Sequence, residues 1–348
     1  MIGVGAFGRN HARVYHSLQQ TESVRLVGVV DPDTVRADSV AREFGCKAFS
    51  SVEQMLTTHS EVQAASVAVP TVLHLEVART LMEAGVDVLI EKPLAATLEE
   101  ADELLRVAGH KRVAQVGLLE RFNPAVRATL PLLRKPMFFE VHRLSVFTPR
   151  ALDVDVVLDL MIHDLDIVLS FVQSKVKEIR AVGLPILSGK VDIANVRVEF
   201  ESGCVANFTA SRVSTERVRK LRFFQQGQYI SIDYGRQDVL VFSVGDERPP
   251  KPKGRLSGAR AGSSIGANLA ADLAANPGHP KPSVNPQIQV TKPAVTSEEP
   301  LLAEIKAFLQ AVRKRATPVV SLEDGRHALD LGLAIQAEIA RHAGKIRV

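Results

Sequence analysis

The sequence contains no tryptophan, and aromatic residues make up only 5% of its 348 residues. Val, Leu, Ile and Ala must therefore fill the core, and a hydrophobic fraction of 46% excludes a disordered or collagen-like chain. The two cysteines, Cys46 and Cys204, stand far apart and form no C-x-x-C pair. They can build neither a disulfide framework nor a zinc site, so we predict no metal and expect a cytoplasmic location.

Long hydrophobic runs are also missing. No stretch of 18 apolar residues occurs, and the most apolar segment, Val154–Val172, is interrupted by four aspartates and one histidine. A membrane-spanning helix is therefore not expected. The N-terminus has no basic region ahead of an apolar stretch, so a signal peptide is not expected either.

The net charge is only +4 and is unevenly distributed. Residues 248–281 hold six basic residues and one acid, so the rest of the chain sums to −1. A near-neutral body does not support a nucleic-acid partner. Residues 249–299 hold eight of the 18 prolines and no aromatic residue. We predict a flexible insertion at about 249–299, and we rank a membrane tether low because the segment lacks an amphipathic apolar face.

Apolar runs and helical patterns alternate over residues 1–120, which favours a parallel sheet covered on both faces. The predicted strands are Val24–Val30, Ala64–Val69, Val86–Ile90 and Val113–Val116. The predicted helices are Asn10–Leu18, Val35–Phe44, Leu73–Glu83 and Leu98–Ala108. We therefore assign an α/β class to the first domain, 1–120.

Period-two patterns dominate the second domain, 121–348. Strands are predicted at Phe138–Phe147, Val191–Phe200, Cys204–Val213, Leu221–Gln225, Tyr229–Asp233 and Val239–Val244. Helices are predicted at Val154–Phe171 and at about 301–313 and 322–341. The strands are too close in sequence for crossover helices, so we predict an α+β domain on a mostly antiparallel open sheet. One face of Val191–Phe200 and Cys204–Val213 is expected to stay partly apolar and to support self-association.

A G-x-G-x-x-G motif opens the chain at Gly3–Gly8. Such glycines permit a tight turn, close approach of a pyrophosphate, and close packing of helix on strand. The motif predicts a Rossmann dinucleotide-binding domain, and a glycine-rich loop without a ligand is the alternative. The predicted cofactor-binding residues of this loop are Gly3, Gly5, Ala6, Phe7 and Gly8. Only Met1 and Ile2 precede the loop, so we expect a first strand cut to a stub, from a misassigned start or a truncation.

Asp31 follows the second predicted strand, Val24–Val30. An acid at this place suits the ribose hydroxyls of NAD and repels the additional phosphate of NADP. The nearest basic residue, Arg36, is five positions further on. The sequence therefore predicts NAD as the cofactor.

Two further groups of polar residues follow predicted strands. Glu91, Lys92 and Pro93 end one strand, while Pro70, Thr71 and His74 follow the strand before it. Ligands bind at the carboxyl edge of open α/β sheets, although each group alone also fits a solvated turn.

Asp159, His163 and Asp166 share one face of the predicted helix Val154–Phe171. Polar groups on a helix that is otherwise fit for burial are costly unless they are paired or used. A histidine beside carboxylates suits proton transfer near neutral pH. The alternative is a helix cap or a satisfied core histidine.

Together, the glycine loop, the Glu-Lys-Pro tripeptide and the Asp-x-x-x-His helix resemble the Gfo/Idh/MocA oxidoreductase family over nearly the whole chain. The resemblance implies an NAD-dependent enzyme that acts on CH–OH groups and forms homodimers or homotetramers through sheet faces. It also implies a catalytic lysine at Lys92, a catalytic pair at Asp159 and His163, and a place near the nicotinamide ribose for Glu91.

Residues 120–125 and 148–164 resemble family members that oxidise the 3-hydroxyl of a UDP-N-acetylhexosamine to a ketone. In that interpretation His163 takes the hydroxyl proton, and Asp159 orients His163 or shares this role. Lys92 stabilises the alkoxide or relays the proton. Arg121, Asn123 and Arg150 are candidates for the substrate phosphates, with a surface role as the alternative. Competing interpretations are an inositol or polyol dehydrogenase, a biliverdin-reductase-like enzyme, and an inactive NAD-binding regulator.

Overall fold

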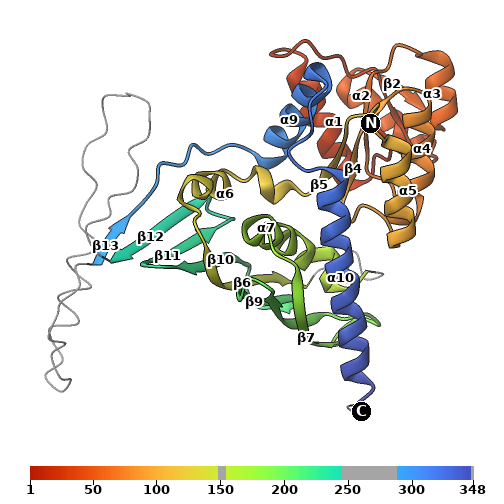
Figure 1. Cartoon of the computed structure of the whole chain (residues 1–348). Coiled ribbons are helices and arrows are strands. Elements are labelled where there is room, and N and C mark those ends of the chain that lie inside the picture. The colour runs from red at the N-terminus through yellow and green to blue at the C-terminus, as the bar shows by residue number, and fades with distance from the viewer. Residues whose placement is uncertain (148–153, 245–287, 346–348) are drawn as a thin grey trace, which may run out of the picture.

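The computed structural model describes residues 1–147, 154–244 and 288–345. An α/β unit forms from the N-terminal part of the chain, and a broad sheet forms from the C-terminal part (Figure 1). The long helix α10 (Leu322–Ala343) runs beside both of them. No helix in these three ranges is long and apolar enough to cross a bilayer.

The strands of the α/β unit are short and parallel, and most of their residues are buried. They are β1 (Gly28–Val30), β2 (Lys47–Phe49), β3 (Ala64–Val67), β4 (Asp87–Glu91) and β5 (Ala114–Gly117). Ile2 makes parallel bridges to both Val30 and Val67, which joins β1–β2 to β3–β4–β5. The predicted first strand is therefore a single bridging residue, and the terminal amine of Met1 donates to the carbonyl of Gly28 at 2.9 Å.

The helices of this unit are α1 (Ala6–Leu18), α2 (Thr34–Phe44), α3 (Val52–Thr58), η1 (Thr71–Leu73), α4 (His74–Glu83) and α5 (Leu98–Ala108). They cover both faces of the strands, as the alternation predicts. Helix α9 (Pro300–Lys314), which the sequence division places in the second domain, packs against α1 (Figure 1). The α/β unit is therefore completed by a segment from near the end of the chain.

Short turns η2 (Leu119–Phe122), α6 (Pro124–Thr129) and η3 (Leu130–Leu132) lead into an eight-stranded sheet. Its spatial order is β13-β12-β11-β10-β6-β9-β8-β7. Only β6 and β9 pair in parallel, so the predicted mostly antiparallel sheet is confirmed. The strands are β6 (Pro136–Val146), β7 (Val176–Leu184), β8 (Ile193–Phe200), β9 (Val205–Ser214), β10 (Val218–Gln225), β11 (Gln228–Asp233), β12 (Asp238–Val244) and β13 (Ile288–Thr291).

Strand β13 falls inside the range predicted to be a flexible insertion. It pairs with β12 at the edge of the sheet, from Val241 opposite Thr291 to Val244 opposite Ile288. Residues 249–287 of that range lie outside the described residues.

Helix α7 (Ile162–Val172) packs on one face of the sheet, over a core that includes Phe139, Phe171 and Phe223. The predicted helix Val154–Phe171 does not start as a regular α-helix. A π-helical turn, η4 (Val157–Met161), precedes α7 and carries Asp159.

The other face of the sheet differs from the prediction. Val196, Val198 and Phe208 are buried in the core, whereas the outward positions of β8 carry Asn195 and Arg197. The apolar part of the outer face lies on other strands, as a column of aromatic rings with centroids 4.9–5.6 Å apart. The column consists of Phe138, Phe224, Tyr229 and Phe242.

Candidate active site

The glycine turn has the geometry of a phosphate-binding loop. Gly3 has φ +78°, and a Cβ there would meet the carbonyl of Ala68 at 2.7 Å. A Cβ on Gly8 would lie 1.9 Å from the carbonyl oxygen of Gly3, so this glycine lets α1 pack on the turn. Gly5 differs, since a Cβ there would meet no atom within 4 Å. As the N-cap of α1 it has no side-chain cap bond, so the first turn offers free N–H groups beside open space.

Two other predicted residues, Ala6 and Phe7, lie within this loop. Phe7 is 41% exposed on the first turn of α1 and packs against His11. Ala6 begins the helix. On the neighbouring strand edge, Pro70 precedes the turn η1, which begins at Thr71. All four therefore lie at the carboxyl edge of the parallel strands, where an α/β sheet binds its ligand.

Asp31 is buried at the end of β1. Its Oδ2 accepts from the N–H of Val4 at 2.9 Å, and its Oδ1 accepts from the N–H of Asp33 at 3.0 Å. Arg36 lies beside it, with Nη1 3.4 Å from both carboxylate oxygens. The sequence argument treated Arg36 as remote, but the Asp33 cap places it in the first turn of α2, facing back toward Asp31. Asp31, the residue predicted to bind the ribose, thus has an arginine beside its carboxylate.

Lys92 and Asp159, which are 67 positions apart, meet in the structure. Nζ of Lys92 donates to the main-chain oxygen of Asp159 at 2.6 Å and lies 3.1 Å from its Oδ1. Both side chains keep part of their surface exposed, 21% for Lys92 and 26% for Asp159. A cation and a carboxylate are therefore paired at the edge of β4, where solvent and substrate have access.

His163 lies in the first turn of α7 and is only 8% exposed. Its Nδ1 has no hydrogen-bond partner among the described residues. Burial, together with the positive charges of Lys92, Arg143 and Arg219, lowers the pKa of His163 well below its usual value. The imidazole is therefore neutral near pH 7 and has a lone pair available for a proton.

Three of the predicted site residues hold the scaffold together. Nδ1 of His74 lies 3.0 Å from the carbonyl of Pro93, and its Nε2 lies 3.0 Å from that of Val69. It therefore clamps two strand ends together, and the structure gives it no free ring nitrogen for a cofactor.

Arg121 donates from Nε and Nη2 to both carboxylate oxygens of Asp166, at 2.7 and 2.8 Å. This pairing occupies the guanidinium fork that a phosphate would need, and it removes Asp166 from the predicted catalytic face. Asn123 caps α6 and donates to Glu120 and to the carbonyl of Tyr234. The phosphate role predicted for Arg121 and Asn123 is therefore replaced by a structural one, and Arg150 lies outside the described residues.

The sequence analysis missed two arginines on the helix-covered face of the sheet. Arg143 donates to both oxygens of Asp164 and to Glu120, and its guanidinium lies 5.2 Å from the ring centroid of Tyr234. Arg219 stands directly opposite Arg143 on β10, is exposed, and forms no ion pair within the described ranges. Although its side chain is exposed, the protein around it displaces part of its water, and this desolvation together with the charges of Arg143 and Arg217 lowers the pKa of Arg219. Arg219 alternates with the apolar residues Leu221 and Phe223, and this period of two in the sequence places it on the same face of the strand as they are. That pattern could have identified Arg219.

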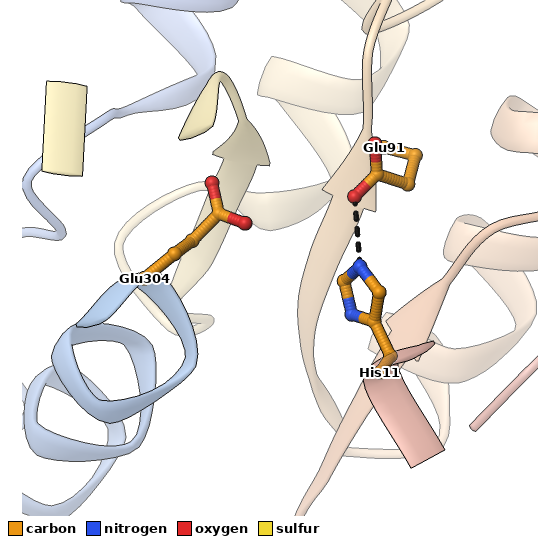
Figure 2. Close-up of side chains that lie close together, drawn as sticks. All are labelled: His11, Glu91 and Glu304. Carbon is orange, nitrogen blue, oxygen red and sulfur yellow. Dashed lines mark hydrogen bonds and ion pairs between the residues drawn. The ribbon is translucent and has the colours of Figure 1, made fainter. Parts of the chain in front are cut away.

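A second group, of which the sequence analysis named only Glu91, lies behind the glycine loop. His11, on the inner side of α1, places Nε2 3.0 Å from Oε1 of Glu91. Glu304 of α9 is fully buried and points toward this pair (Figure 2). Potential ligand atoms of the three side chains lie within 4.8 Å of one another. This cluster borders Lys92 and can share a proton or hold a cation.

Known proteins match the chain over most of its length. A model of an oxidoreductase family with an NAD-binding Rossmann fold matches residues 1–118, and that of the GFO/IDH/MocA C-terminal domain matches residues 135–229. A UDP-N-acetylglucosamine 3-dehydrogenase of Acidithiobacillus ferrooxidans is 40% identical over 251 residues, which cover 70% of this chain and 76% of the relative. A scyllo-inositol 2-dehydrogenase (NAD(+)) of Bacillus subtilis is 28% identical, with 62% and 67% covered.

The solved structures give the same picture. The structure of UDP-N-acetylglucosamine 3-dehydrogenase from Acidithiobacillus ferrooxidans superposes with a TM-score of 0.80 at 31% identity, covering 97% of this chain and 96% of that one. Levoglucosan dehydrogenase in complex with NADH superposes with a TM-score of 0.77 at 17% identity, covering 98% and 96%, and so shares the fold.

Proposed function

The chain belongs to the Gfo/Idh/MocA family of NAD-binding oxidoreductases, and from this we propose that it oxidises the 3-hydroxyl of a UDP-N-acetylhexosamine to a ketone. UDP-N-acetylglucosamine is the first substrate to test. The observation that carries the proposal is the Lys92–Asp159 pair at the edge of β4, with the buried His163 close enough for the charge of Lys92 to lower its pKa. The chain is also 40% identical over 251 residues to a UDP-N-acetylglucosamine 3-dehydrogenase. A regulator without chemistry would have no use for a neutral buried histidine beside a paired lysine.

NAD fits the loop at Gly3–Gly8, because Gly5 leaves open space before the uncapped first turn of α1. When bound there, NAD supplies the hydride acceptor. His163 accepts the hydroxyl proton of the substrate, and Asp159 holds Lys92 in place. The ammonium group of Lys92 stabilises the alkoxide that develops on the sugar oxygen.

The proposal is tested by following NADH formation by the purified protein with UDP-N-acetylglucosamine, free N-acetylglucosamine and myo-inositol. We expect turnover with the UDP-sugar and little with the other two compounds. Preferred oxidation of myo-inositol would replace the proposal by a polyol dehydrogenase, which the scyllo-inositol relative makes the second candidate.

Cofactor choice is expected to depend on both Asp31 and Arg36. The carboxylate of Asp31 repels the 2′-phosphate of NADP, whereas Arg36 beside it attracts that phosphate. We predict a higher kcat/KM with NAD than with NADP in the wild type, and a larger preference in Arg36→Ala. Asp31→Ala should reduce the preference. If Arg36→Ala leaves the ratio of the two kcat/KM values unchanged, Arg36 does not face the ribose.

We assign the diphosphate of the substrate to Arg219. Arg143, opposite Arg219, already pairs with both Asp164 and Glu120, so neither carboxylate is left to pair with Arg219. An anion bound at Arg219 supplies the missing counter-charge. Arg219 also lies close enough to His163 to lower the pKa of the imidazole, so an anion bound there is near the reacting sugar.

Arg219→Ala is therefore expected to raise KM for the UDP-sugar roughly tenfold and to leave KM for NAD and kcat nearly unchanged. The matched control is Arg222→Ala, because Arg222 lies on the same strand, on the opposite face, 3.7 Å from Glu140. The affinity for UDP alone, measured by calorimetry, should fall in parallel with the KM effect. A loss of kcat without a change in KM or in UDP affinity would contradict the assignment.

We further propose that copies of the chain associate through the outer face of the sheet, as a homodimer or homotetramer. The aromatic column Phe138–Phe224–Tyr229–Phe242 is the apolar part of that face. Light scattering tests this, and a strictly monomeric mass at micromolar concentration would refute it.

A further inference from the structure

The His11–Glu91–Glu304 cluster lies outside the proposed reaction centre but touches it. Its members come from α1, β4 and α9, three elements far apart in sequence (Figure 2). His11 and Glu304 are completely buried, and Glu91 is 7% exposed. The base His11 and the acid Glu304 are therefore both enclosed next to Glu91, and all three side chains have little access to bulk water.

The hydrogen bonding of the cluster is incomplete. One imidazole nitrogen of His11 is used, because Nε2 lies 3.0 Å from Oε1 of Glu91. Among the described residues, neither Nδ1 of His11 nor either carboxylate oxygen of Glu304 has a partner. A buried polar group without a partner costs free energy, so these atoms are expected to bond to each other or to a common bridging group.

The charges in the cluster indicate where the proton is. Within the described part of the chain, no lysine or arginine is ion-paired with Glu304, and the charge that acts on it is that of Glu91. Burial and the nearby Glu91 raise the pKa of Glu304 well above its usual value. Tyr15, the other titratable group within its influence, already bonds to Ser66 at 2.7 Å. Glu304 therefore holds a proton that needs an acceptor.

We propose that Glu304 is a neutral carboxylic acid whose O–H donates to Nδ1 of His11, and that this bond fixes the tautomer in which Nε2–H donates to the carboxylate of Glu91. Ligand atoms of the three side chains lie within 4.8 Å of one another, and one bridging water would complete the bond from this O–H to Nδ1. Glu304 and His11 are thus positioning residues, and Glu91 alone carries the negative charge of the cluster.

The chain of bonds continues toward the reaction centre. Oε2 of Glu91 accepts from the main-chain N–H of Lys92 at 3.3 Å. Gly117 leaves room for this carboxylate, because a Cβ there would lie 2.6 Å from Oε1 of Glu91. A fixed Glu91 therefore fixes the main chain from which Lys92 reaches Asp159. Removing the donor at Glu304 should therefore shift the position of Lys92, although no residue that touches the substrate is itself substituted.

Two variants of Glu304 test the donor role, and this readout rests on the proposed function. The amide of Glu304→Gln can donate to Nδ1 as a carboxylic acid does, so kcat is expected to stay within about twofold of wild type. Glu304→Met has similar length and cannot donate, so kcat is expected to fall roughly tenfold or more, with little change in KM for NAD. Equal loss in both variants would overturn the proposal, as would equal activity in both.

The tautomer of His11 can be measured without turnover, by nitrogen NMR of isotope-labelled histidine, with His11→Gln to assign the signal. We expect a neutral imidazole protonated on Nε2 in the wild type and in Glu304→Gln, and a change of state in Glu304→Met. An imidazolium, or a neutral ring protonated on Nδ1, would overturn the proposal even if the enzyme oxidises UDP-sugars. Calorimetry with Zn²⁺ covers the metal alternative, and tight binding that Glu304→Gln abolishes would also overturn it.

Discussion

Lys92→Ala and His163→Ala are each expected to lower kcat by roughly a hundredfold or more, the usual scale for losing a positioned acid–base or charge-stabilising group. The ammonium group of Lys92 is held 3.1 Å from Oδ1 of Asp159, and the imidazole of His163 is buried and neutral. Neither is needed to hold the pyrophosphate, so the dissociation constant for NAD should change little. Steady-state kinetics with the UDP-sugar and fluorescence titration with NADH measure both quantities.

Lys177→Ala serves as the control for removing a lysine, because Lys177 is exposed on β7 and paired with Glu199 at 2.6 Å, away from the cluster. Asp159→Asn should also slow turnover, since it removes the charge that holds Lys92. The three losses should not add, because the residues act as one unit. Near wild-type turnover in both the Lys92 and His163 variants would assign the chemistry elsewhere, and a collapse of NAD binding would make this edge a cofactor anchor.

Gly5→Val is expected to weaken NAD binding by roughly tenfold or more, because its side chain would occupy the space in which the pyrophosphate approaches the main chain. The fold should tolerate the change, since a Cβ at Gly5 meets no atom within 4 Å and its φ of −60° suits any residue. Thermal unfolding of the protein without NAD should therefore be unchanged. Calorimetry with NAD measures the loss of affinity.

Gly8→Ala provides the opposite case. Its Cβ would lie 1.9 Å from the carbonyl oxygen of Gly3, so the turn or the helix must move and the unfolding temperature should fall. If Gly5→Val binds NAD as tightly as wild type, the open space at Gly5 is not the pyrophosphate site. Equal destabilisation by both variants would show that the loop has only a packing role.

The parallel strands β1, β3, β4 and β5 were predictable because each belongs to a short apolar run that alternates with helical patterns. Val88, Leu89 and Ile90, for example, are completely buried between two helical layers. Strand β2 and helix α3 were not predicted, since Lys47–Phe49 is only three residues long and mostly accessible. Strand β7 was missed for a similar reason, because exposed charged residues such as Lys177 and Arg180 interrupt its apolar pattern.

Sequence motifs led to the meeting of Lys92 with Asp159, two residues that each belong to a motif with its own chemistry. The site was not predictable where the chemistry depends on partners from distant elements. Arg121 has the right side chain for a phosphate, but only the fold reveals that Asp166 occupies it. The reverse holds for Glu304, which looks like one acid among many on an amphipathic helix until α9 places it opposite His11.

Helix α10 has a consequence for how the enzyme forms. It begins at a capping box on Ser321, packs closely on β5 where Gly325 meets Val116, passes the π turn where Gly332 meets Leu158, and ends beside β7. This helix therefore sets the separation between Lys92 and the turn that carries Asp159. The ribosome synthesises α10 after the glycine loop, Lys92 and Asp159. The nascent chain can therefore form its glycine loop first, but Lys92 and Asp159 reach their final separation only once α10 has emerged and packed.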